Sequence, residues 1–143
     1  MTPTLAGRLQ TRLVLLAAVG SLWTLAAVPL FTDGPLASGY RSGFTALVVV
    51  AVVGLGWELA YHLIQQFRWD KDWPTLFGLL VGLPEGFVAY RLLDIGIPWA
   101  IAPIDPVTFT WLFGTTWMII WAVASGPLPI VAVRWRFRGG RFW

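Results

Sequence analysis

The stretch FTALVVVAVVGLGWELAYH, from Phe44 to His62, joins an apolar run to a short polar segment. Its first twelve residues carry no charge, whereas the end holds Glu58 and His62, the only histidine of the chain. Residues four apart lie on the same face of a helix, so these two side chains are expected to be neighbours. Ionisable groups inside membrane helices point into protein or a water-filled cavity. The stretch therefore predicts a membrane helix with one polar face.

The composition of the whole chain agrees with this reading. The chain has 143 residues, of which 57% are hydrophobic and only 12% charged, and its mean hydropathy is +0.71. A soluble domain carries about 25% charged residues. We predict a single all-α integral membrane domain over 1–143. The absence of cysteine excludes disulfides, thiolate metal sites and thiol nucleophiles formed by this chain.

Four apolar stretches are long enough to cross a hydrocarbon core of ~30 Å. We expect the spans at 13–31, 44–67, 74–93 and 107–125, followed by a tail over 126–143. Arg8 and Arg12 would flank the first span. A cleaved signal peptide is the alternative, but the apolar run exceeds the usual core of about 7–15 residues.

Three connections separate these spans. A turn-rich loop is expected at 32–43 and a polar connector at 68–74. The segment 94–106 holds three prolines and is expected to lie at the outer interface of the membrane. Pro127 and Pro129 should break the fourth span, since each removes a backbone donor.

The distribution of basic residues predicts the orientation, because Lys and Arg concentrate in cytoplasmic segments. With the N-terminus inside, the outer segments hold only Arg41 and Arg91. The inner segments would hold the other eight basic residues, Arg8, Arg12, Arg68, Lys71, Arg134, Arg136, Arg138 and Arg141. We therefore predict that both termini are cytoplasmic. The Arg-, Ala-, Gly- and Trp-rich composition favours a bacterial inner membrane.

The second and third predicted spans carry matching features. The second has a polar seam formed by Glu58, Tyr61, His62 and Gln65, with Gly54 upstream on the same side. The third has a glycine groove, Gly78, Gly82 and Gly86, in which Glu85 lies beside Pro84. Glycines four apart let another helix approach closely, and the proline should kink the helix. A short connector makes the two spans antiparallel neighbours, so we expect contact between the polar seam and the glycine groove.

Three interpretations of this cluster remain open. It could be a structural clasp in which the polar groups satisfy one another, or a path for protons or cations. It could also hold a metal, with Glu58, His62 and Glu85 as weak candidate ligands that need a further partner. One histidine excludes a bis-histidine haem made by one chain.

Several other residues have simpler expected roles. Arg91 and Asp94 should form a local pair, and Asp105 should start the fourth helix. Thr115 and Thr116 can bond to the backbone of their own helix. The deeper tryptophans Trp23, Trp117 and Trp121 are expected to pack between helices.

The tail alternates basic and aromatic residues. At period two, Arg134, Arg136 and Arg138 would project to one side and Trp135 and Phe137 to the other. Such a strip, with Arg141 beyond it, could anchor the chain to anionic headgroups or dock a cytoplasmic partner.

No hydrolase, phosphate-loop or dinucleotide motif is present, so we predict no enzyme, no cofactor and no nucleic-acid partner. The leading hypothesis is a non-catalytic membrane subunit, anchor or assembly scaffold that packs against itself or other membrane subunits. The alternatives are a small oligomeric proton- or cation-coupled transporter or channel, and a membrane metal-binding or redox subunit.

Overall fold

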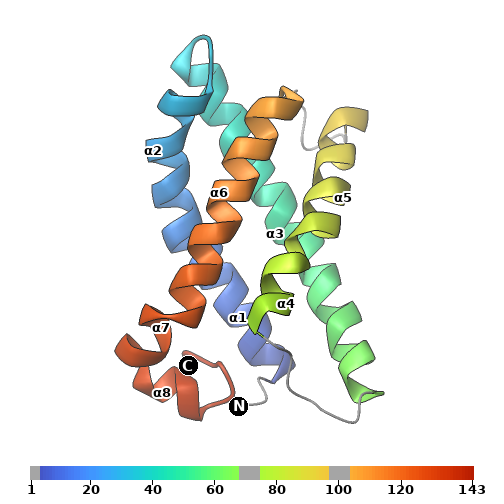
Figure 1. Cartoon of the computed structure of the whole chain (residues 1–143), viewed down its shortest axis with the longest axis vertical. Coiled ribbons are helices and arrows are strands. Elements are labelled where there is room, and N and C mark those ends of the chain that lie inside the picture. The colour runs from blue at the N-terminus through green and yellow to red at the C-terminus, as the bar shows by residue number, and fades with distance from the viewer. Residues whose placement is uncertain (1–3, 68–74, 97–103) are drawn as a thin grey trace.

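Four long helices lie side by side, and both termini lie at the same end of the bundle (Figure 1). The computed structural model describes residues 4–67, 75–96 and 104–143. Every regular element within these ranges is helical. Four helices are long and apolar enough to cross a membrane, over Leu5–Phe31, Leu36–Gln66, Leu76–Ile95 and Pro106–Val131. The predicted all-helical class with four candidate spans is therefore confirmed.

The first helix begins eight residues earlier than predicted, at Leu5 instead of 13. It consists of α1 (Leu5–Leu15), a π-helical turn (Leu16–Gly20) and α2 (Ser21–Phe31). Thr4 caps it, because its hydroxyl accepts a hydrogen bond from the Gly7 amide at 3.1 Å. The prediction that Arg8 and Arg12 flank the helix is wrong. Both lie within α1, where carboxylates of other helices compensate their charges.

The second helix, α3 (Leu36–Gln66), also starts eight residues before the predicted residue 44. Most of the segment expected to be a loop at 32–43 is therefore helical. Tyr40, in this early part of α3, replaces a backbone hydrogen bond that α2 lacks. Pro29 has no amide to donate to the Leu25 carbonyl, and the Tyr40 hydroxyl donates to that carbonyl instead at 3.1 Å.

The third helix is interrupted, as Pro84 predicted. Its two parts, α4 (Thr75–Leu80) and α5 (Gly82–Ile95), are separated at Val81. The Trp117 indole donates to the Leu79 carbonyl near this break at 3.2 Å. The helix ends with Gly96 in the left-handed region, at φ +75°. The polar connector at 68–74 and most of the predicted interfacial loop, 97–103, lie outside the described residues.

The fourth helix, α6 (Pro106–Ser125), starts at Asp105 as predicted. The Asp105 carboxylate accepts hydrogen bonds from the amides of Val107 and Thr108, both at 3.0 Å. The helix breaks at Gly126, before α7 (Pro127–Val131) and α8 (Val133–Phe137). The predicted break at the proline pair is therefore present.

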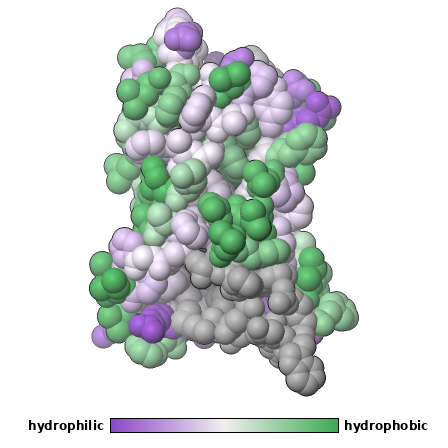
Figure 2. Space-filling view, in the orientation of Figure 1, coloured by the Kyte–Doolittle hydropathy of each residue, from purple (hydrophilic) through white to green (hydrophobic). Residues whose placement is uncertain are grey.

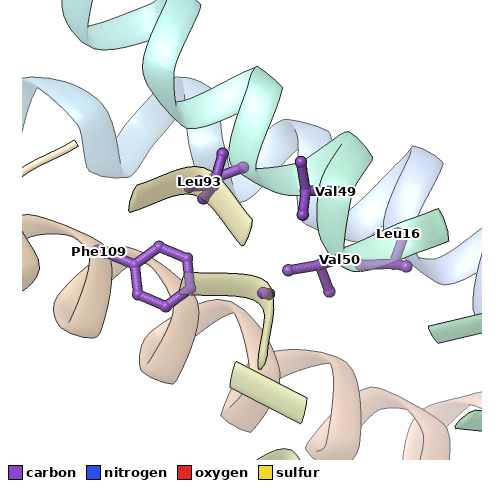
Figure 3. Close-up of a cluster of buried hydrophobic side chains, with 7 residues drawn as sticks. Leu16, Val49, Val50, Leu93 and Phe109 are labelled. Carbon is purple, nitrogen blue, oxygen red and sulfur yellow. The ribbon is translucent and has the colours of Figure 1, made fainter. Parts of the chain in front are cut away.

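Small and branched apolar side chains fill the interior. The larger cluster brings together Leu16, Val49, Val50, Leu93 and Phe109 from four different helical segments (Figure 3). Outside the bundle, large apolar side chains are spread over the visible face (Figure 2). Leu22 and Leu83, for example, are 69% and 72% exposed. An apolar exterior of this kind suits contact with lipid.

Candidate functional site

A buried arginine joins three helices near the end of the bundle that holds the termini. Arg12 of α1 donates from Nε to Glu58 Oε1 of α3 at 3.1 Å. It also donates from Nη2 to Glu85 Oε2 of α5 at 3.0 Å, and from Nη1 to the other oxygen of that carboxylate. Glu85 is fully buried. We call these three residues the Arg12 clasp. The two glutamates, one from each predicted seam, are therefore joined through a guanidinium.

The sequence around the clasp leaves room for that guanidinium. A Cβ added to Gly54 would lie 2.0 Å from Arg12 Nη1, so any larger residue there would displace the guanidinium from this position. On the other side, the centre of the Arg12 guanidinium lies 5.5 Å from the Trp117 ring, within cation–π range. Gly54 was predicted as a helix-packing residue. In the structure it accommodates a charged side chain instead.

Arg8 extends the network one helical turn toward the N-terminus. Its Nη2 donates to Gln65 Oε1 at 2.8 Å, and its Nη1 lies 3.8 Å from Glu58 Oε2. Two arginines and two glutamates give a formal charge of zero when all four are ionised. Unpaired buried charges are strongly unfavourable, so this balance explains how the four groups tolerate burial together.

The predicted polar seam of α3 is only partly assembled. Glu58 and Gln65 join the network, and Tyr61 packs between aromatic rings, 5.8 Å from Trp57 and 6.1 Å from Phe77. His62 is not part of the Arg12 clasp. Its Nδ1 is buried and has no hydrogen-bond partner among the described residues.

The structure does not assemble the three candidate metal ligands. Within residues 4–67, 75–96 and 104–143, no group of three histidine, cysteine or acidic side chains could hold a metal ion. Glu58 and Glu85 instead face the guanidinium of Arg12.

The glycine groove of the third helix is filled from within the chain. A Cβ on Gly82 would lie 2.3 Å from the Trp117 indole, and one on Gly86 would lie 2.4 Å from the Phe113 ring. Phe113 stacks on Phe109 at 5.5 Å and on Trp117 at 5.7 Å, so α6 presents a continuous aromatic stripe to the groove. Gly82 and Gly86 were predicted to pack against another helix, and within this chain that helix is α6. Gly78 is looser, with 3.7 Å to Trp121.

A cavity of about 350 Å³ lies beside the Arg12 clasp. Arg8, Arg12 and Glu58 supply charged groups to its wall, and the remainder is formed by aromatic, aliphatic and small residues. The aromatic lining residues are Tyr61, Phe77, Trp117, Trp121 and Trp135. Its volume falls within the range of small-molecule sites, ~300–1,000 Å³.

The C-terminal tail folds back onto α1. The Gly139 carbonyl accepts from the Thr4 amide at 2.9 Å, and the Gly140 carbonyl accepts from the Thr11 hydroxyl at 3.0 Å. The Trp135 indole donates to the same hydroxyl at 2.6 Å. A Cβ on Gly7 would lie 2.0 Å from the Gly139 oxygen. A glycine in α1 thus lets the tail pack against the helix, and Trp135 and Gly140 also line the cavity.

The period-two model of the tail is wrong, because α8 is helical. Trp135 points toward α1, whereas Phe137 is 80% exposed, so the two rings do not share a face. The tail arginines predicted to meet lipid or a partner are exposed. These are Arg134, Arg136, Arg138 and Arg141.

The simpler expectations are confirmed. Arg91 and Asp94 form an exposed pair at 3.3 Å. Thr115 and Thr116 donate to carbonyls of their own helix, each at 2.6 Å. The Trp23 indole donates to the Thr115 hydroxyl at 2.9 Å, which ties α2 to α6.

Sequence reasoning missed the central role of Arg8 and Arg12. Their spacing of four residues, on a segment that starts with a threonine cap, is a signal that could have placed them on one helical face. Only the pairing with α3 and α5 shows that they lie inside the bundle. Comparison with known protein families, with curated proteins and with solved structures gives no match for this chain.

Proposed function

We propose that this chain is a non-catalytic integral membrane subunit of the bacterial inner membrane that anchors or scaffolds a larger complex. One observation carries the proposal. The charged groups within the bundle pair with one another, whereas four arginines of the tail are exposed at one end. Charges used to join helices favour a fixed scaffold, and an exposed basic end favours contact with anionic headgroups or an acidic partner.

The proposed orientation keeps both termini in the cytoplasm. Arg8 and Arg12 are removed from the count of loop charges, because they lie inside α1. Six inner basic residues then remain against two outer ones, Arg41 and Arg91. The positive-inside rule still favours the same orientation. Both ends lie at one end of the bundle, which is compatible with it.

Purification in mild detergent tests the subunit proposal. The variant in which Arg134, Arg136, Arg138 and Arg141 are all changed to Gln should lose co-purifying proteins identified by mass spectrometry. The double variant Arg41→Gln/Arg91→Gln is the matched control and should retain them. A wild-type chain that purifies without any specific protein or second copy would contradict the proposal. Gly82→Leu is unsuitable here, since it would disrupt packing on Trp117 within the chain.

A proton- or cation-coupled transporter is the second candidate, favoured by the cavity that lies beside the same ion pairs. Two carboxylates from different helices share one guanidinium, and Arg12 and Glu58 line the wall of a sizeable cavity. Protonation of either glutamate would weaken its hold on Arg12, which could couple proton binding to helix movement. Intramembrane carboxylates of this kind often mark ion routes.

Flux into liposomes distinguishes the two candidates. A transporter should show pH-dependent cation or proton flux that Glu58→Gln or Glu85→Gln abolishes. The control Asp94→Asn removes an exposed carboxylate outside the clasp and should leave the flux unchanged. A wild-type chain without flux in either direction of a pH gradient would remove the transporter candidate.

A further inference from the structure

Two charged groups of opposite sign beside the Arg12 clasp, on Arg8 and Glu58, line the cavity and are only loosely paired with each other. Among the residues that the structure describes, Arg8 Nε is buried without a hydrogen-bond partner. Glu58 Oε2 lies 3.8 Å from Arg8 Nη1, beyond hydrogen-bonding distance. Both residues line the cavity. A guanidinium and a carboxylate therefore lie next to each other at one wall, joined to each other only by this long ion pair.

Arg12, unlike Arg8, uses every nitrogen of its guanidinium in a hydrogen bond to a glutamate. Its Nε, Nη1 and Nη2 all donate to the two glutamates, and the face of its guanidinium lies against Trp117. A ligand would have to break the clasp to engage Arg12. Arg8 and Glu58 can bind a ligand while the clasp stays intact, because Glu58 Oε1 alone contacts Arg12.

Charge balance restricts what such a ligand can be. Arg8 and Arg12 balance Glu58 and Glu85, so the network is neutral before a ligand enters. A ligand with one net charge would leave an uncompensated charge in a largely apolar site, at a high energetic cost. A ligand that carries one positive and one negative group keeps the site neutral and can pair with both Arg8 and Glu58.

The remaining walls suit the apolar part of such a ligand. Trp117, Trp121 and Trp135 come from α6 and the tail, and Tyr61 and Phe77 come from α3 and α4. Aromatic rings offer a large apolar surface, and their faces also attract ammonium groups. The volume of about 350 Å³ is far more than one water molecule requires.

We propose that this cavity binds a zwitterion, with its anionic oxygens on Arg8, its ammonium on Glu58 and its apolar part against the tryptophans. Two sources share this chemistry: an amino-acid-like solute with an apolar side chain, and the head of a zwitterionic phospholipid. The inference goes beyond both proposed functions, since it requires neither a protein partner nor ion flux.

Binding to the purified full chain in detergent tests whether a solute must carry both a positive and a negative group. Phenylalanine is the zwitterionic probe, N-acetylphenylalanine the anionic analogue and phenylalanine amide the cationic one, each titrated by calorimetry and tryptophan fluorescence. We expect the zwitterion to bind about tenfold or more tightly than either analogue, because each analogue leaves one charged wall group unpaired.

A second arm tests the lipid source. Native mass spectrometry of the chain from nanodiscs that contain equal amounts of phosphatidylethanolamine and phosphatidylglycerol should show selective retention of phosphatidylethanolamine. Preferential binding of the zwitterion in either arm supports the proposal and identifies the source. Binding of neither zwitterion, or equal binding of singly charged analogues and zwitterion, would overturn it.

Two variants test the assigned positions. Arg8→Gln leaves a net negative network and should shift the preference toward the cationic ligand. Glu58→Gln leaves a net positive network and should shift it toward the anionic one. Arg41→Gln, at an exposed position outside the cavity, is the control and should keep the wild-type order. Unchanged preferences in both cavity variants would contradict the placement. If either variant fails to fold, the wild-type analogue series still decides the proposal.

Discussion

The two ends of the bundle are held together by different interactions. At the end with the termini, the Arg12 clasp and the tail contacts join α1, α3, α5 and the last residues through charged and hydrogen-bonded groups. At the opposite end, α2 and α6 meet through a small apolar cluster of Ala27, Val28 and Leu112, and Tyr40 of α3 packs against it (Figure 1). Gly39 and Gly43 lie against Val28 there and permit close approach.

The two ends illustrate two ways in which a sequence can fix how the helices of a bundle pack. Small residues give close contact between helices but few constraints on which side chains must meet. Two arginines and two glutamates balance each other only when Arg12 meets both carboxylates and Arg8 lies beside Glu58. We infer that the apolar end supplies packing and that the charged end fixes the relative positions of α1, α3 and α5.

The largest effect is expected from removal of the central cation. Arg12→Leu leaves Glu58 and Glu85 without their shared partner, and loss of one member of a buried pair costs about 3–5 kcal/mol of unfolding free energy. Unfolding in detergent, followed by circular dichroism, measures this loss. The control Arg91→Leu breaks an exposed pair and should cost ~0–1 kcal/mol. Equal losses in the two variants would refute the central role of the clasp.

A glycine in the groove should give the next largest effect. Gly82→Ala puts a Cβ into the Trp117 indole, and overpacking of this kind typically costs about 1–3 kcal/mol. Gly114→Ala is the matched control, because a Cβ at that helical position meets nothing within 4 Å. It should stabilise the helix by ~0.5–1 kcal/mol. The same unfolding assay measures both, and equal responses would show that α6 does not fill the groove.

The tail contact can be weakened without touching a charge. Thr11→Val removes the bond to the Gly140 carbonyl and the acceptor for the Trp135 indole. Two hydrogen bonds at ~0.5–1.5 kcal/mol each predict a loss of roughly 1–3 kcal/mol. Hydrogen exchange of the amides at 135–142 should become faster. Thr110→Val, which loses a bond only to its own helix at Pro106, should leave that exchange unchanged.

The smallest effect is expected at the apolar end. Tyr40→Phe removes the donor to the Leu25 carbonyl and should cost about 0.5–1.5 kcal/mol. Pro29→Ala restores the amide that can bond to this carbonyl within α2, so Tyr40→Phe should cost less in that background. A double-mutant cycle on the unfolding free energy measures the coupling. A cycle without coupling would show that the tyrosine does not compensate for the proline.

The number of helices and their approximate positions could be predicted because span length and apolar composition are local properties of the sequence. Pro84 and the proline pair at 127 and 129 likewise predicted breaks, and Asp105 predicted a helix start, through the local chemistry of the backbone. The helix starts at Leu5 and Leu36 could not be placed from hydropathy. Charged or turn-forming residues there are accommodated by contacts with other helices.

The sequence by itself determined that the chain forms four apolar helices. It also showed that two glutamates must face protein and that the glycine groove needs a closely packed neighbour. Only the tertiary structure decided which residues pair with these glutamates and which residues fill this groove. Arg12 proved to be the partner of both glutamates, and the aromatic stripe of α6 proved to fill the groove. The physical reason is that hydropathy and helical periodicity act over a few residues, whereas Arg12 lies 46 positions from Glu58 and 73 from Glu85.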